Sequence, residues 1–171
     1  MVPLLVVTGE SGSGKTTLIA GIVKALSSRG YKVGVIKHSP HHPGMEDRGK
    51  DSGNFSRAGA AITCLTGRNW HYLVTAGDAP GPEGHLHFFS GLDLVLAEGY
   101  KTGRREDTPV IEIIKEGQER RYSTHPLALV FYRLPQGPRA AATPWFTRDD
   151  TAEISAFKEE KILLKEEGQD D

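Results

Sequence analysis

The stretch LLVVTGESGSGKTT, from Leu4 to Thr17, decides the fold of this chain. From Gly9 onward it fits the phosphate-binding loop pattern G-x-x-x-x-G-K-S/T at every required position. The apolar residues before it predict a strand buried on both faces, and an apolar stripe after it predicts a helix over residues 15–29. A glycine-rich turn placed there brings several backbone N–H groups, and the positive end of the helix dipole, onto one phosphate. The sequence therefore predicts a nucleoside triphosphate site in this loop.

Two side chains of the loop have the chemistry that such a site needs. Lys15 can reach the bridge between the β- and γ-phosphates, and the hydroxyl of Thr16 suits a magnesium ion. The loop alone does not indicate which base is bound or whether the nucleotide is hydrolysed or used for phosphoryl transfer, because small-molecule kinases of the uridine kinase type have a similar loop. The predicted nucleotide-binding residues are Gly9, Ser11, Gly12, Ser13, Gly14, Lys15, Thr16 and Thr17.

Length and composition exclude several classes of protein. The 171 residues predict a single nucleotide-binding domain over residues 1–164, followed by a charged, disordered tail over 165–171. A formal net charge of −1 indicates neither a nucleic-acid partner nor an anionic membrane, and no apolar run approaches the ~20 residues of a membrane span. The N-terminus has no signal-peptide pattern, and Cys64 is the only cysteine. We expect a soluble, cytoplasmic protein.

The remaining pattern predicts a three-layer α/β fold, the phosphate-loop NTPase architecture, with a mostly parallel sheet and some antiparallel strands. Long polar loops are expected at residues 38–53 and 76–84. Gly30 should end the first helix. The other expected elements are strands at 31–37, 92–97, 109–114 and 127–131, a hairpin of 61–65 with 72–75, and helices at 55–60 and 151–164.

Two carboxylates are candidates for magnesium and for orienting an attacking water. Glu98 follows the apolar strand at 92–97, so it should lie at the carboxyl end of the sheet beside the phosphates, whereas Asp93 lies at the opposite end. Asp47 belongs to the polar loop after the second strand, where Lys50 could neutralise phosphate charge; a solvated loop without a role explains these residues equally well. The predicted catalytic residues are Glu98 and Asp47, and the predicted metal ligands are Thr16, Asp47 and Glu98.

Two further groups of residues leave alternatives open. His38, His41 and His42 lie close together without the paired spacing of a structural zinc site, so exposed loop histidines compete with a transition-metal site. Basic residues at 100–105 form a patch beyond Glu98, which is either solvated or in contact with a phosphorylated ligand.

These segments together resemble the MobB family, the GTP-binding adapters of molybdopterin guanine dinucleotide biosynthesis. The resemblance covers residues 2–160 in order, and GKDS followed by AGA, with EGYK, is more specific than the phosphate loop. The matching features are the loop at 9–17, Lys37-His38-x-x-His41-His42, Asp47-x-Gly49-Lys50-Asp51-Ser52 leading into Arg57-Ala58-Gly59-Ala60, Glu98-Gly99-Tyr100-Lys101, and Pro109-x-Ile111-Glu112.

The resemblance implies a fold of the dimeric, SIMIBI-type branch of phosphate-loop GTPases. It implies GTP binding with Mg²⁺, slow hydrolysis, and association with MobA, the guanylyltransferase that joins GMP to molybdopterin. Asp47 and Glu98 would flank the metal and the γ-phosphate, and Arg48 or Arg57 of a second subunit could act as an arginine finger. Molybdopterin itself is a further candidate ligand, and a homodimer is expected. A small-molecule kinase and a nickel-handling GTPase remain the alternatives.

Overall fold

The computed structural model describes residues 2–39, 54–55, 58–75, 81–124, 126–131, 143–147, 150, 153–154 and 156. The chain separates into two compact units. The first consists of Met1–His38 with Pro80–Asp171, and the second of Ser39–Ala79. The single domain expected over residues 1–164 stays a prediction.

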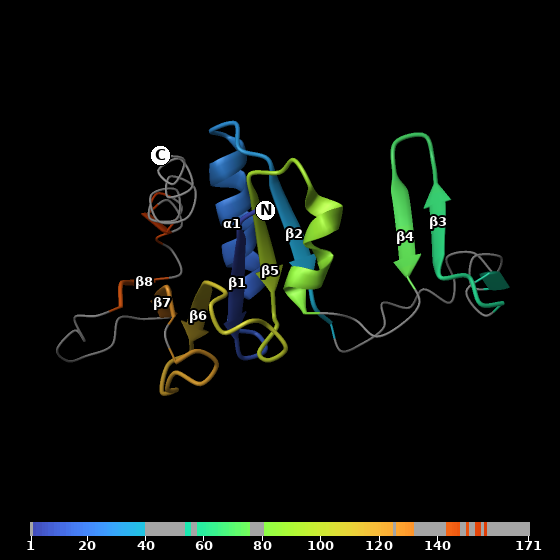
Figure 1. Ribbon diagram of the computed structural model, residues 1–171. Helices are drawn as coiled ribbons and strands as arrows, with labels where there is room; N and C mark the ends of the chain where they lie inside the picture. The colour runs from blue at the N-terminus through green and yellow to red at the C-terminus, as the bar shows by residue number, and fades with distance from the viewer. Residues whose placement is uncertain are drawn as a thin grey trace, which may run out of the picture. The chain divides into compact units, whose positions relative to one another are not determined.

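The first unit is built on a six-stranded sheet of order β2-β5-β1-β6-β7-β8, in which all neighbouring strands are parallel (Figure 1). The predicted α/β class with a mostly parallel sheet is confirmed. β8 was not expected from the sequence, because three residues are too few for a periodic pattern. The strands are β1 (Leu4–Gly9), β2 (Val33–Lys37), β5 (Leu94–Glu98), β6 (Val110–Ile114), β7 (Ala128–Phe131) and β8 (Trp145–Thr147).

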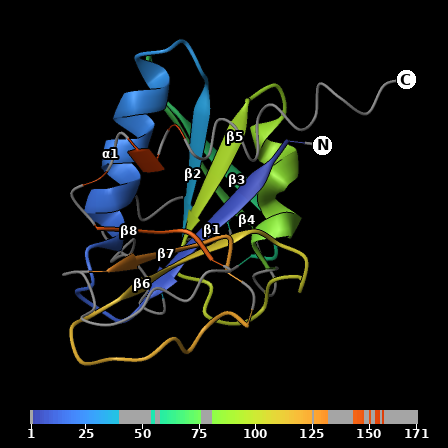
Figure 2. The ribbon, with the colours of Figure 1, turned by 90° about the vertical axis from the view of Figure 1, so that its left-hand side faces the viewer.

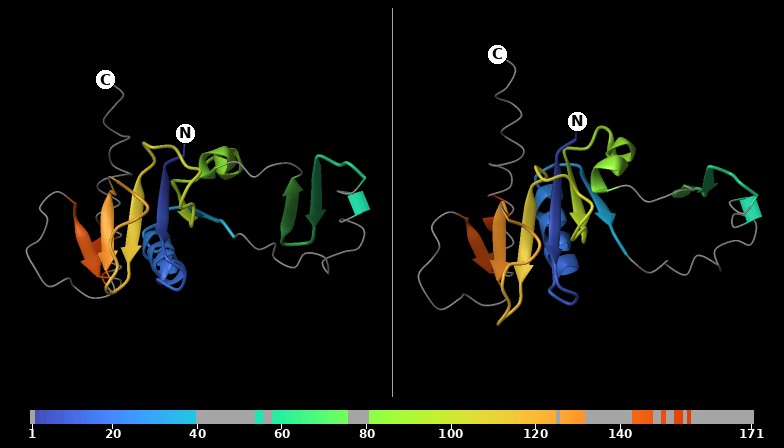
Figure 3. Two further views of the ribbon diagram at one scale, coloured as in Figure 1. Left: turned by 90° about the horizontal axis from the view of Figure 1, so that it is seen from below. Right: turned by 60° about the horizontal axis from the view of Figure 1, so that its bottom comes forward.

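β1 occupies the middle of this sheet and is buried on both faces. Leu5 and Val7 face the core formed with α1 (Lys15–Ser27), whereas Leu4 and Val6 face a second core formed with the 3₁₀ helix η2 (Pro82–Phe89). Figures 2 and 3 show α1 and η2 on opposite faces of the sheet. Because successive side chains of a strand alternate between faces, the continuous apolar run in β1 fills both layers.

Local sequence signals set the ends of α1. The helix begins directly after Gly14 and ends before Gly30, whose φ of +93° is a left-handed conformation that glycine adopts without strain. The N–H of Gly30 donates to the carbonyl of Ser27 and the N–H of Tyr31 to that of Leu26, which is the Schellman arrangement. The predicted helix and its glycine cap are thus confirmed.

The second unit contains an antiparallel hairpin of β3 (Ile62–Thr66) and β4 (His71–Thr75), as the sequence predicts. Its register pairs Ile62 with Thr75, and the turn is closed by a hydrogen bond from the N–H of Gly67 to the carbonyl of Trp70. Of the short helix expected at 55–60, Phe55 is helical together with Asn54, whereas residues 58–60 are not helical, and 58 and 59 form a turn.

Two further expectations for the second segment of the first unit, Pro80–Asp171, have different outcomes. The predicted loop at 76–84 is wrong in its second part, because η2 already begins at Pro82, where the fixed φ of proline suits a first helical position. For the helix expected at 151–164, Glu153, Ile154 and Ala156 are helical, and Ile154 is buried in the core below α1. The rest of that helix and the tail at 165–171 lie outside the described residues.

No helix among the described residues combines the length and apolar character that a membrane span needs.

The burial pattern makes β5 a sensitive test of the sheet. Leu96 is fully buried in β5, whereas Val35 in the neighbouring β2 is 44% exposed. Leu96→Ala should lower the free energy of unfolding by roughly 2–5 kcal/mol, because it removes buried methyl groups and leaves a cavity. Val35→Ala should change it by about 0.5 kcal/mol or less. Urea unfolding followed by circular dichroism measures both, and equal effects would contradict this packing.

Candidate nucleotide-binding site

The sheet topology creates a crevice where the predicted site residues lie. From β1 the chain crosses to β2 in one direction, and from β5 it crosses to β6 in the other, so the connections leave the neighbouring strands β1 and β5 in opposite directions. Such a switch point leaves an opening outside the carboxyl ends of the two strands. Gly9 ends β1 there, and Glu98 ends β5.

The loop between β1 and α1 depends on three glycines with positive φ. Gly12 and Gly14 have φ of +68° and +86°, and Gly9 has φ of +144°. A Cβ on Gly9 would lie 2.6 Å from the carbonyl oxygen of Ile113 in β6, so the backbone could not approach its neighbour with any larger residue there. Gly14, directly before α1, provides no side-chain cap, and the first turn of the helix carries no acidic residue. The helix N-terminus is therefore open to an anion.

Lys15 folds back over this loop. Its Nζ donates to the carbonyls of Glu10 at 2.8 Å and Gly9 at 3.1 Å, which keeps the ammonium beside the backbone of the turn. Burial lowers the pKa of Lys15, since the ammonium loses hydration, while the carboxylate of Glu98 acts in the opposite sense. The hydroxyl of Ser13 is buried without a hydrogen-bond partner among the described residues. A phosphate oxygen would be a stronger acceptor for both groups than what the loop offers.

Thr16 and Glu98 meet as the sequence predicts. The Thr16 hydroxyl donates to Glu98 Oε2 at 2.8 Å, and Lys37 Nζ lies 3.5 Å from Oε1 of the same carboxylate. Glu98 is 8% exposed, and the N–H of Gly99 next to it donates to the carbonyl of Val7, which fixes the end of β5 against β1. A hydroxyl and a carboxylate side by side are the oxygen ligands that Mg²⁺ prefers.

Glu10 adds a network that sequence reasoning missed. Its carboxylate accepts a hydrogen bond from the hydroxyl of Tyr122, lies 3.3 Å from Lys101 Nζ, and lies 3.9 Å from the guanidinium of Arg121. The hydrogen bond from Tyr122, together with the one from Lys101, lowers the pKa of the Glu10 carboxyl. Lys115 reaches the same loop, where its Nζ donates to the carbonyl of Ser11 at 2.5 Å. From the sequence, only the position of Lys115 directly after β6 could have indicated its contact with the loop.

Several predicted residues lie outside the described part of the chain. These are Asp47, Lys50, the arginines Arg48 and Arg57, and the histidines His41 and His42. His38 is described, and its ring lies 5.0 Å from that of Tyr100, centroid to centroid. Among the described residues, no three His, Cys, Asp or Glu side chains come together as a metal site. Roles for Asp47 and the histidine loop stay predictions.

The donors that are described fit a nucleotide phosphate and a hard cation. The loop supplies left-handed glycines, an open helix N-terminus, the Lys15 ammonium and the unpartnered Ser13 hydroxyl. Thr16 and Glu98 supply adjacent oxygen ligands. All eight loop residues predicted from sequence, together with Glu98, belong to this one end of the sheet.

Comparison with known proteins assigns the family. The family model of molybdopterin guanine dinucleotide synthesis protein B, MobB, matches residues 4–130. The chain belongs to the MobB family. The molybdopterin-guanine dinucleotide biosynthesis adapter protein of Escherichia coli (strain K12) is 37% identical over 124 residues, covering 68% of each chain. The protein of the same name from Haemophilus influenzae is 37% identical over 121 residues, which span 69% of this chain and 65% of that protein.

Solved MobB structures share the fold. A MobB homolog from Bacillus stearothermophilus superposes with a TM-score of 0.65 at 25% identity, over 95% of this chain and 96% of that one. Bacillus subtilis MobB has a TM-score of 0.68 at 21% identity, over 91% and 97% of the two chains, and so supports the fold alone. The MobB architecture expected from the phosphate loop, the EGYK segment and the strand after it is confirmed.

The close approach of Gly9 to β6 can be tested against a second glycine of the loop. Gly9→Ala should lower the free energy of unfolding by about 1–3 kcal/mol through backbone strain, with a comparable cost from crowding against Ile113. Gly14→Ala has strain alone, since nothing lies within 4 Å of its Cβ position. Thermal unfolding of the two variants should rank Gly9→Ala as the more destabilised. The reverse order would contradict the described loop.

Proposed function

We propose that this chain is an adapter of molybdopterin guanine dinucleotide biosynthesis that binds GTP with Mg²⁺ and associates with a MobA-type guanylyltransferase. Membership of the MobB family supports the pathway, since its relatives are named as adapter proteins of this biosynthesis. We further propose a homodimer and a cytoplasmic location. Both rest on the resemblance and composition described above.

The meeting of Thr16 with Glu98 is the observation that supports nucleotide and metal binding most directly. These residues are 82 positions apart, yet their side chains are hydrogen bonded beside the phosphate-binding loop. Lys15 lies over the same loop. The hydroxyl, the carboxylate and the lysine therefore lie together beside the loop, as a phosphate-loop nucleotide site requires.

Each group has a defined role in the proposed complex. The backbone of Gly9–Thr17 and the Lys15 ammonium would hold the phosphates, and Thr16 with Glu98 would hold the magnesium ion. Bound magnesium would neutralise charge on the triphosphate and favour attack by water. Asp47 is proposed beside Glu98 from the family resemblance. Slow hydrolysis is expected, because the arginines described near the loop have other partners: Arg121 lies 3.9 Å from the carboxylate of Glu10, and Arg104 and Arg105 bond elsewhere.

The alternatives have less support. A small-molecule kinase would use Arg104 and Arg105 as lid arginines, but Arg104 donates to the carbonyls of Tyr100, Lys101 and Tyr122, and Arg105 pairs with Asp107. A nickel-handling GTPase would rely on His38, His41 and His42, of which only His38 is described, against Tyr100. Neither alternative gains an observation of its own.

Nucleotide binding and adapter function can be tested in one set of titrations. The wild-type chain should prefer GTP to ATP and CTP, and Lys15→Ala should weaken GTP binding about tenfold or more, since charge-assisted hydrogen bonds contribute roughly 1.5–3 kcal/mol. Calorimetry measures the affinities, and size-exclusion chromatography with the MobA guanylyltransferase of the same source should show a complex that depends on GTP. Lys24→Ala, on the exposed side of α1, is the matched control. Equal affinity for all three nucleotides without association would contradict the proposal.

Thr16 offers a separate test of the metal. Mg²⁺ should strengthen GTP binding by the wild-type chain and by Thr16→Ser, which keeps the hydroxyl, but not by Thr16→Ala. Calorimetry with and without Mg²⁺ separates this effect from binding of the phosphates themselves. Retention of the full magnesium effect in Thr16→Ala would exclude Thr16 as a ligand.

A further inference from the structure

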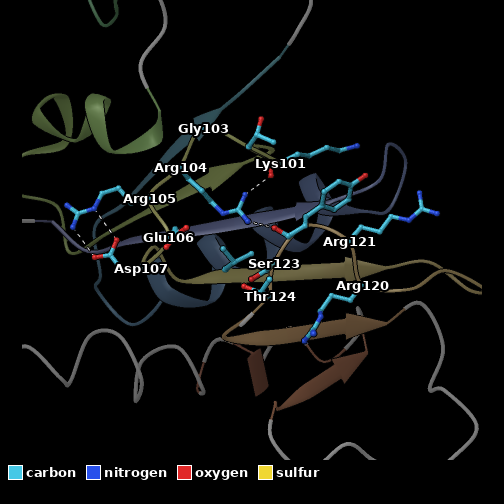
Figure 4. A pocket seen from close by; sticks show the side chains of 13 residues that line it. Lys101, Gly103, Arg104, Arg105, Glu106, Asp107, Arg120, Arg121, Ser123 and Thr124 are labelled. Atoms are coloured by element: carbon cyan, nitrogen blue, oxygen red, sulfur yellow. Dashed lines mark hydrogen bonds and ion pairs between the residues drawn. The ribbon is translucent and has the colours of Figure 1, made fainter.

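A basic pocket lies on the face of the first unit opposite α1. It is formed by the segment after β5 and the segment after β6, and its volume is about 880 Å³ (Figure 4). Val110 at its base belongs to the core on the η2 face. Ligand pockets for small molecules have volumes of about 300–1,000 Å³, and this pocket lies within that range.

Positive charge dominates the lining. The described walls contribute five cationic side chains, from Lys101, Arg104, Arg105, Arg120 and Arg121, against two acidic ones, from Glu106 and Asp107. Arg105 and Asp107 pair with each other, whereas Arg120 has no hydrogen-bond or ion-pair partner among the described residues. The whole chain has a formal net charge of −1, so this excess is local. A hollow with an excess of positive charge attracts anionic ligands.

A buried carboxylate holds the arginine-bearing wall in place. Glu112 in β6 is 2% exposed, and its oxygens accept the N–H groups of Arg121 at 2.7 Å, Tyr122 at 3.1 Å and Ser123 at 3.1 Å. A buried charge is unfavourable unless it is well hydrogen bonded, and here all three donors come from consecutive residues of one wall. The side chain of Arg121 therefore projects from a fixed backbone, and Arg120 directly precedes it.

Arg104 joins the two walls. Its guanidinium donates to the carbonyls of Tyr100 and Lys101 in its own segment and to that of Tyr122 across the pocket. Figure 4 shows the pair of Arg105 and Asp107 at one end, and Lys101 and Arg121 extending toward the other. A pocket whose walls are held by such bonds loses little entropy when a ligand binds.

Glu10 connects this pocket to the phosphate-binding loop. Its carboxylate forms ion pairs with Lys101 and Arg121, and it accepts a hydrogen bond from Tyr122, so three residues of the pocket lining contact one residue of the loop. Lys101 also lies over the ring of Tyr122, 4.6 Å from its centroid. A dianionic ligand would compete with Glu10 for the same two cations.

We propose that this pocket is a second ligand site, which binds a small molecule carrying a phosphate group through Lys101, Arg120 and Arg121. The volume of the pocket favours a small phosphorylated molecule, and the formal net charge of −1 gives no general attraction to nucleic acid. The site goes beyond the proposed function, and it holds whether or not the phosphate-binding loop takes GTP.

The test uses inorganic phosphate as the probe and the full chain with Lys15→Ala, which removes the ammonium of the phosphate-binding loop. Amide resonances of residues 101–107 and 120–124 should shift saturably in an NMR titration with phosphate at constant ionic strength. Adding Arg120→Gln and Arg121→Gln should weaken binding about tenfold or more, as expected for lost charge-assisted hydrogen bonds. Arg29→Gln, after the end of α1 on the opposite face, should leave the affinity unchanged.

The variant Glu10→Gln distinguishes a ligand-binding role of Lys101 and Arg121 from a purely structural role. Removing the competing carboxylate should strengthen phosphate binding several-fold, because Lys101 and Arg121 lose their anionic partner. Absence of saturable shifts in the pocket amides would overturn the proposal, as would shifts confined to residues 9–17 or equal losses in the Arg29→Gln control. Thermal unfolding of each variant checks that it is folded, and the affinity of the Lys15-intact chain for GTP tests the nucleotide site separately.

Discussion

The parallel pairing of β1 with β5 is the constraint on which the rest of the site depends. Val7 is the partner of Glu98 in this register, and Gly99 donates to the carbonyl of Val7. The carboxyl ends of the two strands therefore lie together, and a side chain from each side of the crevice can meet there. A shift of one residue would turn Glu98 to the opposite face of the sheet and leave Thr16 without its partner. Core packing on both faces of β1 protects this register.

The same loop serves two environments. On one side, Lys15 and Thr16 face the crevice where phosphate and magnesium are proposed. On the other, Glu10 contacts the residues that line the basic pocket. A ligand in one of these two sites can affect binding in the other only if the loop has two arrangements and the ligand binds them with different affinities. The carboxylate of Glu10 is the group through which such a difference would act.

The parts of the structure that were predictable depend on local patterns. The glycine-rich turn, the apolar runs of β1 and β5, and the glycine after α1 each determine their own conformation within a few residues, so the loop, Glu98 and the helix end were found from sequence. The contacts of Glu112 and Glu10 were missed because their partners are 9–11 and 91–112 residues away, and only the folded chain brings these residues together. β8 and η2 were missed because their segments lack a long apolar period.

A crystal structure of the chain with a non-hydrolysable GTP analogue and Mg²⁺ tests the central claim most directly. The account predicts the β-phosphate within the loop from Gly9 to Thr17, contacted by Lys15, with Mg²⁺ on the hydroxyl of Thr16 and beside the carboxylate of Glu98. A nucleotide bound elsewhere on the molecule, or a loop without phosphate at saturating analogue, would contradict it.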